Sequence, residues 1–137
     1  MRFLSLILFL ALFVPGNFGI AAENDEIEYL LSFVGGSDCI FIRNGGEYQA
    51  KEAREHLEVK YNHIKRRIKT AEDFIDKIAS KSSLSGRQYE VRCDSVKLQT
   101  SQWLREALAS YRVSVENQEK EKKNAGSSRF MPLCRCK

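Results

Sequence analysis

The stretch FIRNGGEYQAKEAREHLEVKY, residues 41–61, decides how we expect this chain to fold. It begins with apolar, β-prone residues, and the Asn-Gly-Gly sequence at 44–46 is typical of a tight hairpin turn, because Asn and Gly adopt positive φ at low cost. From Ala50 to about Ile68, apolar residues recur every three or four positions. This spacing predicts a long amphipathic helix. The stretch therefore predicts a β-hairpin that leads directly into a helix.

Patterns on either side predict further helices and a second strand. Apolar residues occur at helical spacing in residues 26–34 and 100–115, and Thr70 is a good N-terminal cap for a helix over residues 71–80. Residues 88–93 alternate between apolar and polar side chains, as a half-buried strand does. The sequence shows no internal repeat. We therefore expect a single α+β domain of about four helices packed against a small antiparallel sheet.

The first 22 residues, MRFLSLILFLALFVPGNFGIAA, are typical of a secretory signal peptide. Arg2 gives a basic start, residues 3–14 are apolar apart from one serine, and small residues precede the expected cleavage after Ala21 or Ala22. The apolar run is shorter than the roughly 20 residues that a membrane-spanning helix needs. We therefore expect a mature protein without a membrane span, located in the periplasm or secreted. An uncleaved N-terminal anchor is the alternative.

The formal net charge of +4 is unevenly distributed along the chain. Residues 118–137 contain six Lys or Arg and two Glu, whereas residues 23–117 contain 15 basic and 16 acidic side chains. Nucleic-acid binding requires a concentrated basic surface, so we expect no nucleic acid as a partner of the body. We expect residues 23–117 to form the folded domain and residues 118–137 to form a mobile basic tail.

All four cysteines follow the expected signal peptide, and an oxidising compartment favours disulfides. We favour the pair Cys39–Cys93 among the three possible pairings. Both residues follow the inward side of their strands, so adjacent strands in the correct register would bring them together. Two free buried thiols are the alternative. We expect Cys134 and Cys136 to stay outside this bond and either to pair with each other or to bind a partner.

The long helix is expected to carry a basic edge. At 100° per residue, His56, Lys60, His63 and Arg67 fall on one flank of its apolar stripe. Arg43, at the end of the first strand, could converge on this flank. Such an edge could bind an anionic ligand or an acidic partner. The alternative is an ordinary helix boundary, at which lysine stems cover apolar surface and their charged ends stay in water.

The sequence assigns no catalytic residue, metal ligand or cofactor. His56 and His63 are seven residues apart, about 10.5 Å along a helix, which is too far to share a zinc ion comfortably. The SKSSLSG segment at 80–86 supplies hydroxyl groups and a lysine, but neither G-x-S-x-G nor S-x-x-K occurs. We therefore expect Ser82 and Ser83 to lie in a turn that follows a helix.

Three blocks of the sequence carry a family resemblance: FIRNG at 41–45, EAREHLEVK at 52–60, and RIKTAEDFIDKIASKSSLSGRQYEV at 67–91. In this order they resemble the YfeK-like family of small exported bacterial proteins, which have a domain of unknown function. The resemblance extends over about residues 27–112, and it implies export and one small domain but no activity. The residues that match the family pattern are Arg43, Asn44, Gly45, His56, Leu57, Lys60, Ser80, Ser82, Ser83, Gly86 and Tyr89.

The polar residues among these positions fall in the hairpin turn, on one flank of the long helix and in the loop after the third helix. A compact fold could bring them to one rim, so we take six of them as candidate binding residues: Arg43, Asn44, His56, Lys60, Ser82 and Ser83. The favoured hypothesis is a non-enzymatic exported binding or interaction module whose partner is an unknown protein or a small anionic ligand. One alternative is a small hydrolase or transferase that uses His56 as the base and a loop serine as the nucleophile. The other is a purely structural envelope protein.

Overall fold

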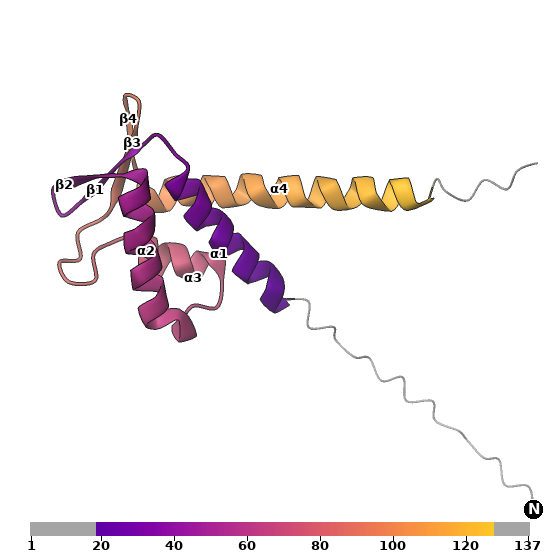
Figure 1. Ribbon diagram of the computed structural model, residues 1–137, viewed down its shortest axis with the longest axis horizontal. Helices are drawn as coiled ribbons and strands as arrows, with labels where there is room; N and C mark the ends of the chain where they lie inside the picture. The colour runs from indigo at the N-terminus through magenta and orange to yellow at the C-terminus, as the bar shows by residue number, and fades with distance from the viewer. Residues whose placement is uncertain (1–18, 128–137) are drawn as a thin grey trace, which may run out of the picture.

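A computed structural model describes the backbone of residues 19–127 and the side chains of residues 24–125. Four helices lie beside a four-stranded sheet, and one of them, α4, extends well beyond the rest of the molecule (Figure 1). No helix within the described range is long and apolar enough to cross a membrane. In chain order the elements are α1 (Gly19–Gly35), β1 (Ile40–Arg43), β2 (Gly46–Gln49), α2 (Ala50–Ile64), the 3₁₀ turn η1 (Lys65–Arg67), α3 (Ala71–Phe74), the π-helical turn η2 (Ile75–Ala79), β3 (Glu90–Cys93), β4 (Val96–Gln99) and α4 (Thr100–Ser127).

The sheet has the strand order β2-β1-β3-β4, and every neighbouring pair is antiparallel. Its centre is the pair Phe41 and Val91, which lie opposite each other and are both buried. The Phe41 ring contacts Trp103 of α4 at a centroid distance of 5.7 Å, so this face of the sheet packs against the helices. The other face carries ion pairs, such as Arg92 to Glu47 at 2.8 Å. The predicted α+β fold with a small antiparallel sheet is confirmed.

The chain contains two successive hairpin–helix units, β1–β2–α2 and β3–β4–α4. The pairs Ile40↔Gln49 in β1–β2 and Glu90↔Gln99 in β3–β4 are offset by 50 residues, and the two helices begin at residues 50 and 100. The two turns match as well, since Asn44 and Asp94 both have a φ of 53°. The β1–β3 register relates the units by an approximate two-fold axis at Phe41↔Val91. The sequence itself shows no repeat, so the similarity is one of element order and strand register.

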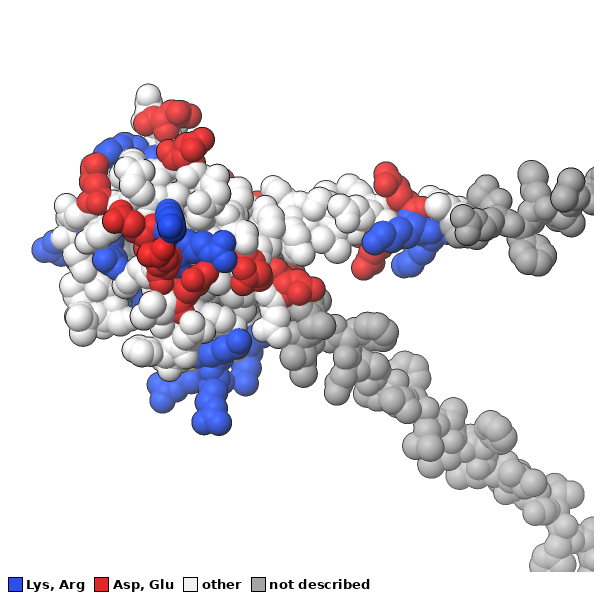
Figure 2. Space-filling model, in the orientation of Figure 1, with Lys and Arg blue, Asp and Glu red and all other residues white. Residues whose placement is uncertain are grey.

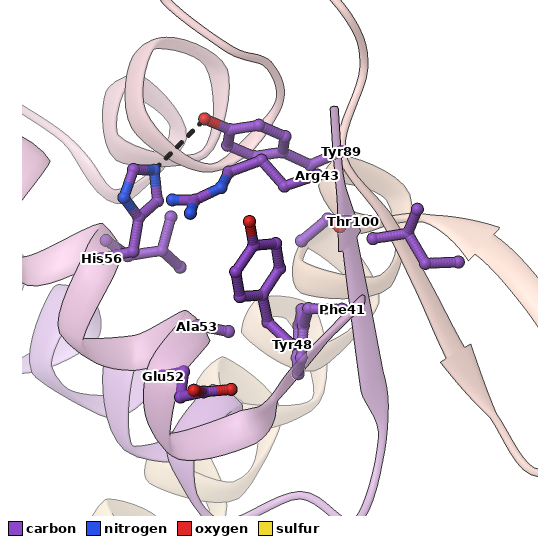
Figure 3. Close-up of a pocket in the computed structure, with 10 residues that line it drawn as sticks. Phe41, Arg43, Tyr48, Glu52, Ala53, His56, Tyr89 and Thr100 are labelled. Carbon is purple, nitrogen blue, oxygen red and sulfur yellow. Dashed lines mark hydrogen bonds between the residues drawn. The ribbon is translucent and has the colours of Figure 1, made fainter. Parts of the chain in front are cut away.

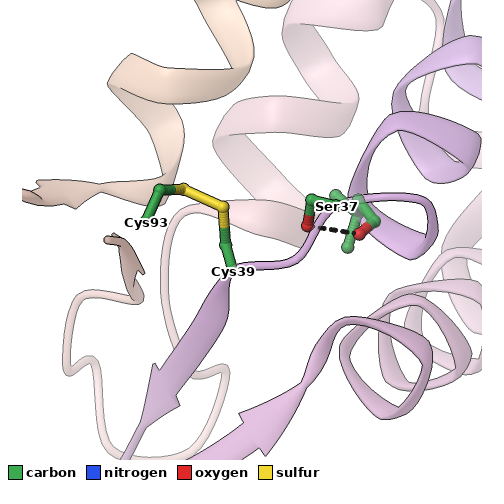
Figure 4. The surroundings of a disulfide bond; sticks show 4 residues. Ser37, Cys39 and Cys93 are labelled. Atoms are coloured by element: carbon green, nitrogen blue, oxygen red, sulfur yellow. Dashed lines mark hydrogen bonds between the residues drawn. A yellow bond between two sulfur atoms is a disulfide. The ribbon is translucent and has the colours of Figure 1, made fainter.

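The favoured disulfide is present. Cys39 and Cys93 are bonded, and their Cα atoms are 4.4 Å apart (Figure 4). The β1–β3 register runs from Ile40↔Arg92 to Ile42↔Glu90. One further pair at the first end places Cys39 opposite Cys93, and one further pair at the other end places Arg43 opposite Tyr89. One strand pairing therefore sets both the covalent bond and the position of Arg43. The predictions for Cys134 and Cys136 lie outside the described residues.

The helices agree with the predicted pattern in the body and differ at their ends. The long helix ends at Ile64 and continues as the turn η1, so the predicted helical end near residue 68 was too late. Thr70 caps α3 as predicted, and its Oγ1 accepts a hydrogen bond from the Asp73 amide at 3.0 Å. The strand β4 was not predicted. The helix α4 continues to Ser127, past the expected tail boundary at 118, whereas residues 1–18 of the expected signal peptide and residues 128–137 lie outside the described range.

Aromatic side chains join the first and last helices. Tyr29 of α1 stacks on Tyr111 of α4 with ring centroids 4.2 Å apart, and Phe33 lies 4.5 Å from Trp103. On the visible side of the body, acidic and basic side chains are mixed over the centre, and a group of basic side chains alone projects from the lower edge (Figure 2). The site described next lies on the other edge of the helix layer, between α2 and the loop that follows η2.

Candidate functional site

A cavity of about 490 Å³ opens between the first hairpin, α2 and the loop that follows η2. The structure brings all six candidate binding residues to its walls, although they are up to 40 residues apart in the sequence. The first hairpin contributes Arg43 and Asn44, α2 contributes His56 and Lys60, and the loop contributes Ser82 and Ser83. Tyr48, Val59, His63, Leu84 and Tyr89 complete the lining.

The hairpin and the loop are held together at the mouth of this cavity. Asn44 occupies the positive-φ position of the turn, and its side-chain Oδ1 accepts a hydrogen bond from Ser85 Oγ at 2.6 Å. The loop is closed on itself by Ser82 Oγ, which accepts a hydrogen bond from the Ser85 amide at 3.3 Å. Asn44 and Ser82 therefore shape the wall of the cavity, in addition to lining it.

Arg43 extends from the last position of β1 across the site. Its guanidinium carbon lies 4.4 Å from the centre of the Tyr48 ring, a cation–π contact that orients the side chain. Figure 3 shows Arg43 between the Tyr89 and Tyr48 rings, with His56 facing it from α2. Because Arg43 is the last residue of β1, the hairpin turn fixes the position from which this side chain reaches the cavity.

Lys60 is held by backbone carbonyls. Its Nζ donates to the carbonyl oxygens of Ile78, in η2, and of Lys81, just beyond η2, at 2.7 and 2.6 Å. It also lies 5.1 Å from the centre of the Tyr89 ring. Burial, reinforced by the charges of Arg43 and Lys81, lowers the pKa of Lys60 from 10.5 to about 8. Lys60 is therefore still mainly protonated at pH 7.

His56 contacts a tyrosine hydroxyl. Its Nε2 lies 3.3 Å from Tyr89 Oη (Figure 3). Burial, together with the charges of Arg43 and Lys60, holds the pKa of His56 below its ordinary value of 6.5, so the ring is mainly neutral at pH 7. Burial raises the pKa of Tyr89. The hydrolase hypothesis requires a contact between His56 and a loop serine, but the hydrogen-bond partner found for His56 among the described side chains is Tyr89.

A second, smaller space of about 30 Å³ adjoins the first. Four side chains line both spaces and form the neck between them: Arg43, Tyr48, His56 and Tyr89. The inner pocket is otherwise lined by Phe41, Ile42, Glu52, Ala53, Leu57 and Thr100 (Figure 3). Thr100 is 2% exposed, and its Oγ1 is a buried side-chain oxygen that has no hydrogen-bond partner among the described atoms.

Sequence reasoning missed Tyr48 and the inner pocket. Tyr48 stands between the turn and the helix in a strand of four residues, too short for its alternation to be read. Tyr89 lies in the predicted strand over residues 88–93 and matches the family pattern, but it was not among the six candidate binding residues. Thr100 lies at the start of the range predicted to be a helix, which gives no sign of a pocket. Among the described residues, no group of three or more His, Cys, Asp or Glu could hold a metal ion.

The comparisons with known proteins identify the family of the domain. The model of a family of unknown function, DUF5329, matches residues 21–112. The chain belongs to this family. It is also 48% identical over 52 residues to the uncharacterised protein YfeK of Salmonella typhimurium, an alignment that spans 38% of this chain and 43% of that protein. The similarity thus covers less than half of the length of this relative, and no solved structure matches the chain.

Proposed function

We propose that this protein is a non-enzymatic binding module and that the outer cavity takes a small anionic ligand. The observation that carries this proposal is the charge of the lining. Arg43 and Lys60 both reach the cavity, and none of the described residues that line it is Asp or Glu. A carboxylate or phosphate between these two cations would receive charge-assisted hydrogen bonds from Arg43.

The mutual influence of the cations supports this assignment. The charge of Arg43 contributes to lowering the pKa of both Lys60 and His56. Like charges held together in a partly buried place oppose each other, and a bound anion relieves this repulsion. The same anion would favour protonation of Lys60, so binding and proton uptake are coupled.

The second hairpin–helix unit provides a comparison within the same molecule. At the offset of 50 residues, the second unit has Cys93, Glu106 and Ser110 where the first has Arg43, His56 and Lys60. The second unit forms the same hairpin and helix without a basic flank. The hairpin–helix unit therefore does not itself require Arg43 and His56, which favours a role in binding, whereas Lys60 also holds the end of η2 and the loop that follows.

We also propose that the protein acts after export, in the periplasm or outside the cell. Residues 1–22 have the charge and apolar pattern of a signal peptide. The Cys39–Cys93 bond is of the kind that an oxidising compartment maintains. Mass measurement of the protein recovered from its native host tests this directly, because a chain that retains residues 3–14 would contradict the proposal.

The binding proposal is tested by titrating the mature protein with inorganic phosphate and sodium formate at constant ionic strength. Amide NMR shifts would report the location and affinity of binding. We expect shifts at the cavity, and a dissociation constant at least about tenfold weaker in Arg43→Gln, since a hydrogen bond to a charged group contributes about 1.5–3 kcal/mol.

Lys97→Met is the matched control, because Lys97 lies on β4 and pairs with Glu90 on the opposite face of the sheet. This variant should bind both anions as the wild type does. Equal weakening in Arg43→Gln and Lys97→Met, or shifts confined to residues outside the cavity, would show that the anions bind only through general electrostatic attraction.

A further inference from the structure

The inner pocket narrows the class of anion, and this inference rests on the proposed function. Arg43 lines both spaces, so an anionic group bound to its guanidinium lies at the neck between them. A group attached directly to that anion would reach the inner pocket, whereas the rest of a larger ligand would occupy the outer cavity. The chemistry of the inner walls therefore indicates what is attached to the anion.

Those walls are mostly hydrocarbon, apart from the Thr100 hydroxyl, whose oxygen is itself buried. Phe41 and Leu57 are 6% and 4% exposed, and the side chain of Ala53 adds a single methyl group. Glu52 also lines this space, but its Oε2 is engaged by the Gln49 amide at 3.0 Å, where it completes the cap of α2. A ligand group that enters the pocket thus exchanges water for aliphatic and aromatic carbon, which favours an alkyl group.

The size of the pocket limits the length of that group. A water molecule needs about 10–15 Å³ of comparable space, so a pocket of about 30 Å³ accepts roughly two or three groups of that size. The buried side chains of Phe41 in β1 and Leu57 in α2 line this space. A long acyl chain would therefore have to displace the core.

We propose that the ligand is a carboxylate with a short aliphatic chain, held by Arg43 at its charged end and by the inner pocket at its alkyl end. A carboxylate joins directly to carbon, so its chain enters the pocket without an intervening polar atom. A phosphate ester would place an oxygen at the neck. The guanidinium of Arg43 also matches the two oxygens of a carboxylate.

The test is a series of sodium salts, namely formate, acetate, propionate, butyrate and hexanoate, titrated into the mature wild-type protein at constant ionic strength. Burial of each methylene should tighten binding about fourfold for the first two or three carbons, after which the affinity should stop rising. Inorganic phosphate serves as the anion without an alkyl group.

Ala53→Leu fills the inner pocket and should remove the dependence on chain length while formate still binds. Thermal unfolding shows whether this variant is folded, and Ala53→Val is a smaller substitute. The wild-type series is decisive without either variant. If formate and phosphate bind but propionate binds no tighter, the alkyl inference is overturned and the anion site stands. If none of the salts binds at the cavity, the proposed function falls as well.

Discussion

The Cys39–Cys93 bond should account for a large part of the stability of this domain. The two residues are separated by 54 positions, and in the chain-entropy model a loop of this length restricts the unfolded state by about 4 kcal/mol. Domains of this size are stable by about 5–15 kcal/mol. Loss of the bond is therefore expected to leave about 1–11 kcal/mol of stability, so the domain stays folded but unfolds at a lower denaturant concentration.

The perturbation is the double substitution Cys39→Ala/Cys93→Ala in a Cys134→Ser/Cys136→Ser background, which prevents the remaining thiols from forming new pairs. Urea unfolding followed by circular dichroism gives the free energy of unfolding. With a slope of about 1–2 kcal/mol per molar urea, the midpoint should fall by about 2–4 M relative to the background protein. Addition of a reductant to the background protein should produce a similar fall.

A loss below about 1 kcal/mol would refute this reasoning, because it would mean that the unfolded chain is already restricted or that the bond does not form. Peptide mapping without reduction separates these two explanations. A mapped bridge between Cys39 or Cys93 and the C-terminal segment would instead contradict the strand register itself.

Two further perturbations address the site. Thr100→Val should stabilise the protein by about 1 kcal/mol in urea unfolding, because it removes a buried hydroxyl that has no partner among the described atoms. The backbone amide at position 100, which donates to the Tyr89 carbonyl at 3.0 Å, is kept. A loss of stability would show that the hydroxyl is hydrogen-bonded. Anion affinity should fall as the pH rises through about 8, where Lys60 loses its proton, and Lys60→Arg should flatten this profile in the same NMR titration; an identical profile in the variant would assign the pH dependence to another group. The free energy of unfolding should change with pH in the opposite direction to anion affinity. Because the pKa of Lys60 is lowered in the folded protein, the unfolded chain binds more protons than the folded one between about pH 8 and 10.5. The contribution of Lys60 therefore makes the wild type more stable as the pH rises through this window.

Features encoded locally could be predicted from the sequence. The Asn-Gly turn, the stripe of α2 and the Thr70 cap each depend on residues within a few positions of one another, and the structure has all three. The disulfide could be predicted because strand alternation places Cys39 and Cys93 on the inward face of their strands. The meeting of the six polar residues could also be predicted, because it follows once the hairpin, the helix and the loop that carry them pack against one another.

Features that depend on contacts between distant segments, or on the similarity of the two units, could not be predicted in this way. The strand β4 has only four residues, and Val96 is 58% exposed, so its pattern gives little contrast between the two faces. The similarity of the units is hidden because residues 40–61 and 90–111 are identical only at Gln49/Gln99 and Tyr61/Tyr111. The inner pocket is formed by β1, α2 and the start of α4, whose proximity no local pattern expresses.

The two-fold relation between the hairpins has a consequence for the two ends of the β1–β3 strand pair. At the offset of 50 residues, Cys39 corresponds to Tyr89 and Cys93 corresponds to Arg43. The disulfide and the Arg43–Tyr89 neighbours therefore occupy equivalent ends of the β1–β3 strand pair. In an arrangement of two similar units, these two ends have equivalent positions. Here the disulfide closes one end, whereas the proposed anion site occupies the other, so the covalent bond maintains the strand pairing on which both ends depend.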